Sequence, residues 1–183
     1  MRKANAVDGT ALLHWVELTL PDPPWKELEP FVGLVFLDPD GGLSARGGRA
    51  GDPAAATEPS LTVRLPIGVP GRVIPDDEAA ARGLKSTPEW LERFGPQPPR
   101  DAPWRVDPAL SGRFHPKWPD ELQVLIDGGD ARDELCWVQV DAVDGDAYVG
   151  QLLHPPHALT HVKKGDRIRF DLPPGSRHPR YLP

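Results

Sequence analysis

The sequence predicts an α+β protein that is mainly β, with a small curved barrel at its C-terminus. Short apolar or alternating runs recur along the chain, and 18 glycines and 24 prolines divide them into short segments. Near the C-terminus, two alternating runs flank an Asp-Gly turn at 144–146, which is a strong hairpin signal. A chain of 183 residues also buries enough surface to fold without disulfides or a bound metal.

The N-terminal part, residues 1–110, is expected to be β-rich with many loops. Residues 11–20 and 61–65 alternate between apolar and polar side chains, as half-buried strands do. The apolar run 31–37 is bounded by prolines, so it predicts a buried strand. These runs predict at least three strands in this part of the chain.

Two short helices and one long loop are predicted in the same part. Residues 76–82 begin with three acidic side chains, which favour the first turn of a helix, and Gly83 provides an end. Residues 88–94 begin with a proline and stop before Gly95, which predicts a second short helix. The stretch 38–60 is rich in glycine and nearly lacks large apolar side chains, so we expect a long exposed loop.

Residues 111–183 are expected to form the barrel, either as a separate module or as part of one compact unit with the N-terminal part. The predicted elements are strands at 121–126, 135–140, 147–153 and 167–172, with a Pro-started helix at 155–164. Strand, hairpin, strand, short helix and strand is the order typical of a small SH3-like barrel.

The barrel segment carries a motif that resembles a known bacterial domain. It reads Trp137-Val138, then Tyr148-x-Gly150-x-x-x-His154-x-Pro156, then Lys164-Gly165-Asp166-x-Ile168-x-Phe170. This motif resembles the YegJ-type domain of unknown function, which is found in many bacteria. His154 stands where that family usually has asparagine. The resemblance implies a small β-rich module of a bacterial cytoplasmic protein and brings no reaction with it.

An internal repeat is a further hypothesis. Gly33 is followed by Pro39 at the same spacing that separates Gly150 from Pro156, and each glycine follows a tryptophan-containing strand. This pattern suits two copies of one hairpin. Chance similarity between two strand pairs is the favoured explanation.

His154, His157 and His161 are the residues with metal-ligand spacing. If 155–164 is helical, His157 and His161 lie one turn apart on the same face, a spacing that can chelate zinc. No neighbouring acidic residue completes a ligand motif, so a packed or solvent-exposed helix edge is the favoured interpretation. We therefore expect no cofactor and keep zinc as the alternative.

No catalytic residue is predicted. Cys136 is the single cysteine, which excludes an internal disulfide. The alternation in 135–140 places it on the face of Val138 and Val140, so we expect a buried thiol rather than a nucleophile. The glycine-rich stretch 41–51 lacks the Gly-Lys-Ser/Thr sequence of a phosphate-binding loop. The sequence thus favours a non-enzymatic protein without excluding an enzyme.

Charge is unevenly distributed along the chain. Residues 161–183 carry six basic and two acidic side chains, a balance of +4, whereas the whole chain carries −6. Basic strands of small barrels bind nucleic acids, but the acidic remainder of −10 repels a phosphate backbone. Internal pairing between acidic and basic segments is therefore the simpler interpretation, and nucleic acid is the less favoured partner.

The chain is expected to be cytoplasmic and to have no membrane partner. No stretch approaches the roughly 18 apolar residues that span a bilayer. Charged and polar residues also interrupt the N-terminal run, which therefore differs from a signal peptide. The oligomeric state is left open.

The predicted function is that of a non-enzymatic bacterial binding module that contacts a protein partner. An immunity or inhibitor protein for a toxin is one concrete form of this function. The expected contact residues are Trp137, Tyr148, His154, Lys164, Arg167 and Arg169. A metal-binding protein or metal-dependent enzyme that uses the three histidines is the second hypothesis. Nucleic-acid binding through the basic C-terminus is the third.

Overall fold

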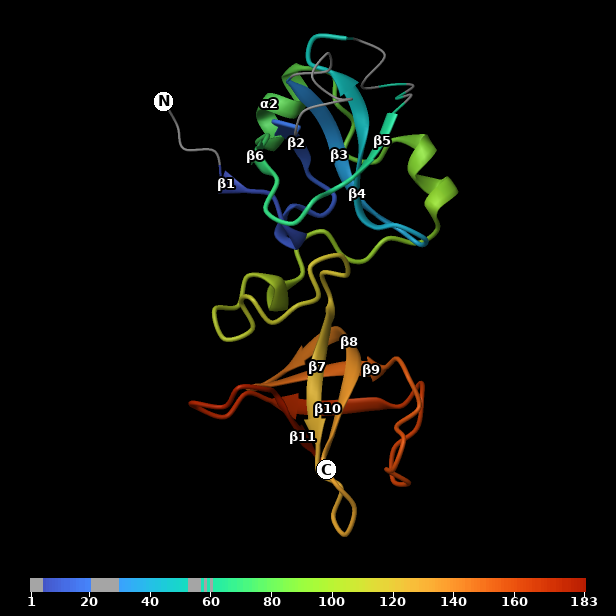
Figure 1. Ribbon diagram of the computed structural model, residues 1–183. Helices are drawn as coiled ribbons and strands as arrows, with labels where there is room; N and C mark the ends of the chain where they lie inside the picture. The colour runs from blue at the N-terminus through green and yellow to red at the C-terminus, as the bar shows by residue number, and fades with distance from the viewer. Residues whose placement is uncertain (1–4, 21–29, 53–56, 58, 60) are drawn as a thin grey trace. The chain divides into compact units, whose positions relative to one another are not determined.

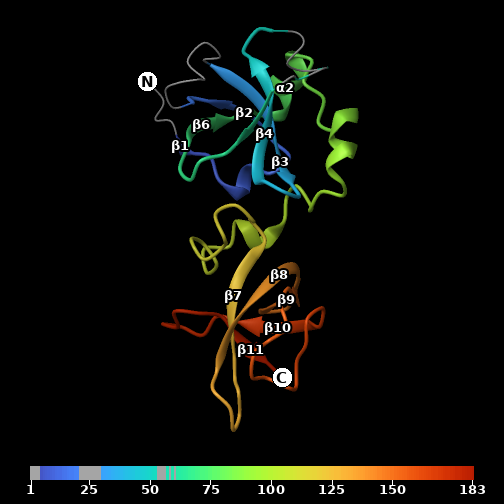
Figure 2. The ribbon, with the colours of Figure 1, turned by 45° about the vertical axis from the view of Figure 1, so that its right-hand side comes forward.

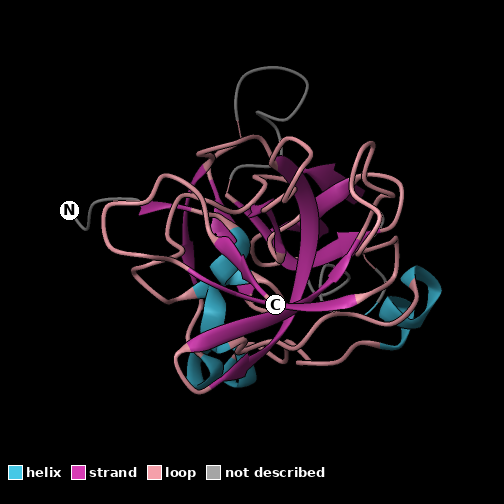
Figure 3. Ribbon diagram, turned by 90° about the horizontal axis from the view of Figure 1, so that it is seen from below, coloured by secondary structure: helices cyan, strands magenta, loops and turns pink. Residues whose placement is uncertain are grey.

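The computed structural model describes residues 5–20, 30–52, 57, 59 and 61–183. The chain divides into two units, Met1–Asp101 with Pro116–Trp118 and Ala102–His115 with Pro119–Pro183. Strands and loops make up most of the described chain, and the helices are short (Figure 3). The mainly β prediction is therefore confirmed. No helix in these ranges is long and apolar enough to cross a membrane.

The N-terminal unit is built on a six-stranded sheet with the order β1-β6-β2-β3-β4-β5 (Figure 1). The strands are β1 (Asn5–Ala6), β2 (Trp15–Leu18), β3 (Phe31–Asp38), β4 (Gly42–Arg49), β5 (Leu61–Arg64) and β6 (Pro70–Val73). Every neighbouring pair is antiparallel. The strands predicted at 31–37 and 61–65 are confirmed. The one at 11–20 is shorter, because the 3-10 helix η1 (Gly9–Ala11) precedes it.

Both faces of the sheet are buried at β3. Side chains of one face pack in a core with η1, and those of the other pack against the two helices α2 (Asp76–Ala81) and η3 (Glu89–Phe94). A strand that is covered on both sides needs apolar residues at every position, which explains the continuous run in β3. The two helices confirm the predicted short helices, although η3 is a 3-10 helix.

The expectation of an exposed loop over 38–60 is wrong for Gly42–Arg49, which forms β4 between β3 and β5. Glycine here permits close strand packing rather than flexibility. A Cβ atom on Gly47 would lie 1.9 Å from the carbonyl oxygen of Val32 in β3. Because strand pairing uses the backbone, β4 forms with few large apolar side chains. The same residues therefore form no phosphate-binding loop.

The C-terminal unit is a closed five-stranded barrel with the order β10-β11-β7-β8-β9. Its strands, coloured from yellow to red in Figure 1, are β7 (Glu121–Ile126), β8 (Glu134–Asp144), β9 (Ala147–Leu152), β10 (Arg167–Asp171) and β11 (Arg180–Leu182). The β8–β9 hairpin turns at Gly145, whose φ is 63°, as the Asp-Gly pattern predicts. The β7–β8 connection protrudes from the end of the barrel in both side views (Figure 2).

Strand β11 closes the barrel and was not predicted. It lies in the Pro- and Arg-rich tail, and it pairs antiparallel with β10 and parallel with β7. Its three residues are too few to show an alternating pattern in the sequence. It is recognised as a strand only from its pairing with β10 and β7 in the structure.

The barrel interior follows the predicted alternation. Its core contains Leu122, Val124, Ile126, Cys136, Val138, Val140, Ile168 and Phe170. The Cys136 side chain is 6% exposed, and burial, with a smaller contribution from the charge of Glu134, raises the pKa of its thiol. The prediction of a buried cysteine is thus confirmed.

Residues 102–115 belong to the barrel unit, and residues 116–118 belong to the N-terminal unit. Trp104 is buried in the barrel core, and its indole N–H donates to Asp120 at 2.6 Å. Arg105 donates to both oxygens of the same carboxylate at 2.7 Å. These contacts attach residues 102–115 to the barrel.

The predicted helix at 155–164 is wrong, because the β9–β10 connection is irregular. The Glu134 carboxylate accepts the backbone N–H groups of His157 at 2.8 Å and of Ala158 at 3.2 Å. The Asp166 carboxylate accepts the N–H of Lys163 at 2.9 Å. These side-chain acceptors compete with the carbonyl groups that a helix would use.

The two hairpins of the proposed repeat differ in register. Gly33 lies opposite Val16, directly after a tryptophan, whereas Gly150 lies opposite Val140, three residues after one. Equivalent glycines therefore do not occupy equivalent positions in the two strand pairs.

Candidate functional site: the Trp137 pocket

A pocket of about 270 Å³ lies on the outer surface of the barrel unit. It is lined by Gly112, Arg113, Gln123, Trp137, Arg177, His178 and Pro179, which we call the Trp137 pocket. Gln123 of β7 and Trp137 of β8 are cross-strand partners that alternate with core residues, so their side chains lie on the outer face. Small-molecule sites usually measure roughly 300–1,000 Å³, so this pocket is suited to a single side chain of a partner.

The indole of Trp137 contacts the side chain of His115, and backbone hydrogen bonds position the residues around it. Its ring lies edge-on to the ring of His115, with centroids 5.4 Å apart and planes at 70°. The backbone carbonyl of Trp137 accepts the N–H of Leu153 at 2.9 Å. The backbone N–H of His115 donates to the backbone carbonyl of Glu121. The tryptophan is half-buried, so one part of the ring packs on the barrel and the rest faces the pocket.

Arg113 joins the two loops that form the pocket wall. Its Nε donates to the carbonyl of Ala109 at 3.0 Å, and its Nη atoms donate to the carbonyls of Ser176 and Arg177. All three acceptors are neutral. Within the described ranges no carboxylate pairs with this guanidinium, so the charge of Arg113 is not compensated locally.

Three of the other basic side chains of the barrel unit have an acidic partner, among them Arg105 with Asp120, whereas the remaining ones have none among the described residues. Arg167 and Arg169 of β10 pair with Asp141 at 2.7 Å and Asp144 at 3.0 Å, both from β8. Arg177 is exposed at the pocket, and its guanidinium has no acidic partner among the described residues. The pocket thus brings together two arginines without an acidic partner, in a unit that carries twelve acidic and nine basic residues.

The structure brings only one of the predicted contact residues to this pocket, namely Trp137. Tyr148 is buried in the barrel, and its hydroxyl donates to Asp107 at 2.6 Å. Burial and this hydrogen bond raise the pKa of Tyr148 to about 12. His154 and Lys164 are exposed in the β9–β10 connection and do not line the pocket.

The three histidines of the predicted metal site are not arranged as ligands. No group of three or more His, Cys, Asp or Glu residues in the described chain is placed to hold a metal ion. The helix that would have aligned His157 and His161 is not formed. The ring of His161 instead packs near the ring of Tyr181, with centroids 6.1 Å apart.

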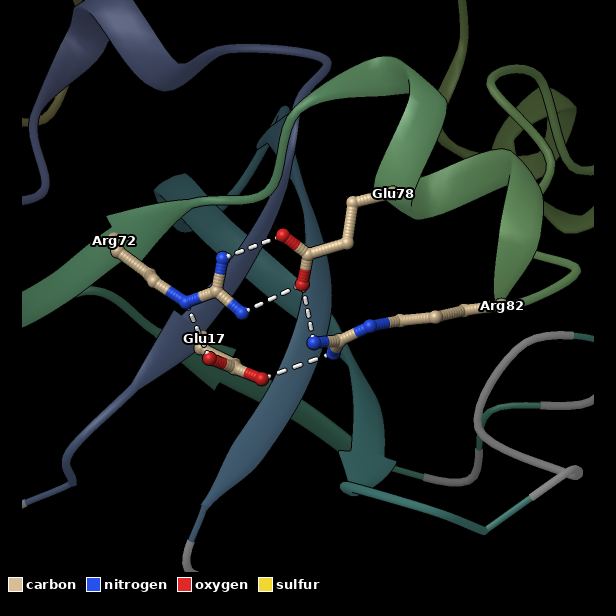
Figure 4. A network of polar contacts seen from close by, with 4 residues as sticks. All are labelled: Glu17, Arg72, Glu78 and Arg82. Carbon is tan, nitrogen blue, oxygen red and sulfur yellow. Dashed lines mark hydrogen bonds and ion pairs between the residues drawn. The ribbon is translucent and has the colours of Figure 1, made fainter.

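A second polar cluster lies in the N-terminal unit, where Arg72 and Arg82 bind Glu17 and Glu78 (Figure 4). Arg72 donates to Glu17 at 2.6 Å and to both oxygens of Glu78 at 2.7 and 2.9 Å. Arg82 donates to Glu17 at 2.9 Å and also contacts Glu78. Each carboxylate thus accepts from both guanidinium groups, and the network connects α2 to β2 and β6.

The arginines keep both glutamates of this network ionised. Burial would raise the pKa of Glu17, but hydrogen bonds from Arg72 and Arg82 outweigh it and lower the pKa. The hydrogen bond from Arg72 is the main cause of the lowered pKa of Glu78. Glu17 and Arg72 also line a cavity of about 570 Å³. Because their charges satisfy each other, we assign the network a stabilising role rather than a catalytic one.

Sequence reasoning missed Arg113, Gln123 and His178 as site residues. Arg177 entered only as part of the total basic charge of the C-terminus. No local pattern marks these residues, because they come from two loops and a strand that are distant in the sequence. These basic residues lie near the outward-facing Trp137 only because β11 closes the barrel, and the sequence does not predict that closure.

Comparison with protein-family models, with curated proteins and with solved structures finds no match for this chain. The resemblance to the YegJ-type domain therefore stays a prediction. The geometry of the Trp137 pocket is the basis for assigning a function.

Proposed function

We propose that this protein is a non-enzymatic binding module that contacts a protein partner through the Trp137 pocket. The observation that carries the proposal is a half-buried indole, packed against the His115 ring, beside two arginines that have no acidic partner in the described chain. Tryptophan and arginine are enriched among the residues that dominate the binding energy of interfaces. A tryptophan side chain has only two rotatable bonds, so it also loses little conformational entropy when a partner docks.

The barrel architecture supports a contact made by side chains. A closed barrel has no free strand edge to which a partner could add a strand. A pocket of about 270 Å³ accepts one anchoring side chain, which the surrounding surface would supplement. A partner protein fits these features better than a small substrate does.

We further propose an SH3-like curvature of the barrel and a bacterial cytoplasmic setting, with an immunity or inhibitor role as one form of the contact. The C-terminal sequence motif supports the bacterial setting. The net charge of −6 suits a protein that remains monodisperse and binds a partner electrostatically.

Nucleic-acid binding is the second candidate, because a base can stack on an indole while arginines bind phosphate. The net charge of −6 disfavours nucleic-acid binding. The ion pairs of Arg167 and Arg169 also disfavour it, because these two residues belong to the basic C-terminal segment that would contact the nucleic acid.

Affinity purification from a lysate of the source organism, read out by native mass spectrometry, tests the function. We expect one protein to co-purify stoichiometrically with the wild-type chain and with Arg132→Ala, and to be lost with Trp137→Ala. Arg132 is exposed and does not line the pocket, so it provides the control. Equal recovery by Trp137→Ala would exclude the pocket as the contact, and the lack of any stoichiometric protein would count against the function.

A further inference from the structure

Building on the proposed protein contact, we infer that the Trp137 pocket recognises an acidic peptide segment. A carboxylate of the partner binds at Arg113 and Arg177, and an adjoining apolar group packs on the indole of Trp137. This assignment names the chemistry of the partner, which the proposed function leaves open.

The hydrogen-bonding groups of the pocket are mainly donors. The indole N–H of Trp137 and the guanidinium of Arg177 are donors without a hydrogen-bond partner among the described residues, and the amide of Gln123, also without a partner, offers both a donor and an acceptor. Arg113 has five N–H donors, of which three are used on carbonyl groups. Those carbonyls, from Ala109, Ser176 and Arg177, are thereby occupied. A ligand that fits must bring acceptors and negative charge, and a carboxylate brings both.

Carboxylate is favoured over the phosphates of a nucleic acid by the charge around the pocket. The barrel unit carries twelve acidic and nine basic residues, so a polyanion that extends beyond the pocket meets net negative charge. A peptide can place one or two acidic side chains in the pocket and continue with neutral or basic residues. The positive charge at Arg113 and Arg177 is thus matched locally without repulsion elsewhere.

The expected effects differ between the aromatic ring and the charges. An exposed charge pair usually changes affinity by about 1.5- to 5-fold when it is removed, and reversal of its sign adds repulsion. A central tryptophan anchor usually contributes about 30-fold or more. Because exposed charges are screened, affinity should also fall as salt is raised from low to physiological concentration.

Fluorescence anisotropy with the full chain and four labelled probes tests the inference. The probes are an octapeptide with two Glu beside one Leu and one Phe in an otherwise neutral Gly/Ser sequence, the same peptide with Gln for Glu, the same with Lys for Glu, and a single-stranded oligothymidylate. We expect binding of the Glu peptide alone, weakened about tenfold by Arg177→Glu and about 30-fold by Trp137→Ala. Arg132→Glu is the matched charge reversal in the protruding β7–β8 connection, and it should leave affinity unchanged (Figure 2).

Each contrary result has a distinct meaning. Equal affinity for the Glu and Gln peptides would overturn acid recognition while leaving the contact at Trp137 in place. Tighter binding of the oligothymidylate that is abolished by Arg177→Glu would overturn the peptide in favour of nucleic acid. Failure of all four probes on the wild-type chain would overturn this inference, whereas the co-purification with Trp137→Ala decides the proposed function separately. Arg177 is exposed, so its reversal tests the pocket without disturbing the core.

Discussion

The Glu134 carboxylate accepts the backbone N–H of His157 at 2.8 Å, which ties the start of β8 to the irregular connection between β9 and β10. The same carboxylate accepts the N–H of Ala158 at 3.2 Å. One side chain thereby satisfies two adjacent donors of a connection that lacks helical hydrogen bonds. Its ionisation should control the order of this connection.

Acidification is expected to loosen the β9–β10 connection. The hydrogen bond from His157 is the main cause that lowers the pKa of Glu134 below its usual value of 4.5. A lowered pKa in the folded state means that the stabilisation is complete above pH 4.5 and is lost as the pH falls through the lowered value. The amide chemical shifts of His157 and Ala158 should titrate with a midpoint below 4.5. Glu134→Gln should abolish this titration, and a midpoint at or above the usual value would contradict the assignment.

Removal of the buried acid at 120 is expected to destabilise the barrel strongly. Arg105 and Asp120 pair at 2.7 Å with side chains 3% and 5% exposed, and the same carboxylate accepts the indole N–H of Trp104. Asp120→Ala leaves a buried cation without this partner, so urea unfolding should show a loss of about 3–5 kcal/mol. The double change Arg105→Met with Asp120→Leu removes both charges and should recover much of it. A loss below about 1 kcal/mol for Asp120→Ala would refute this role.

The substitution Gly47→Ala is expected to destabilise the sheet of the N-terminal unit. The added Cβ would lie 1.9 Å from the carbonyl oxygen of Val32, so the β3–β4 pair must separate. Overpacking of this kind costs about 1–3 kcal/mol or more, which thermal or urea unfolding can measure. Arg49→Ala in the same strand changes an exposed side chain and should stay within about 0.5 kcal/mol. Similar stability of the two variants would show that β3 and β4 are not packed this closely.

Loss of Arg72 is expected to weaken the attachment of α2 to the sheet. Arg72 donates to Glu17 and to both oxygens of Glu78, so its removal leaves two half-exposed carboxylates close together. Arg72→Ala should cost about 1 kcal/mol at low salt, and less at 1 M salt, where charges are screened. Arg72→Lys should recover only part of the loss, because lysine cannot bind both oxygens in a bidentate way. A cost that does not depend on salt would indicate lost packing rather than lost charge interactions.

The sequence predicted strands in both units, and in the barrel it also predicted the hairpin turn and the burial of the cysteine. The strands at β7 and β8, the turn at Gly145 and the burial of Cys136 follow from alternation and turn chemistry, which are local properties of the chain. The errors arose where a local pattern had more than one meaning. Glycines in 42–49 suggested a loop but allow close packing of β4, and two prolines suggested a helix where Glu134 holds an irregular connection.

The sequence by itself thus determined a mainly β chain, its barrel hairpin and a buried cysteine, because each depends on neighbours a few residues apart. Only the tertiary structure decided where the candidate site lies. Arg113 contacts the carbonyl of Arg177 across 64 residues of sequence, and β11 must pair with β7 to bring those loops beside Trp137. The charge of the pocket likewise depends on which basic side chains find an acid after folding, since Arg167 does and Arg177 does not among the described residues.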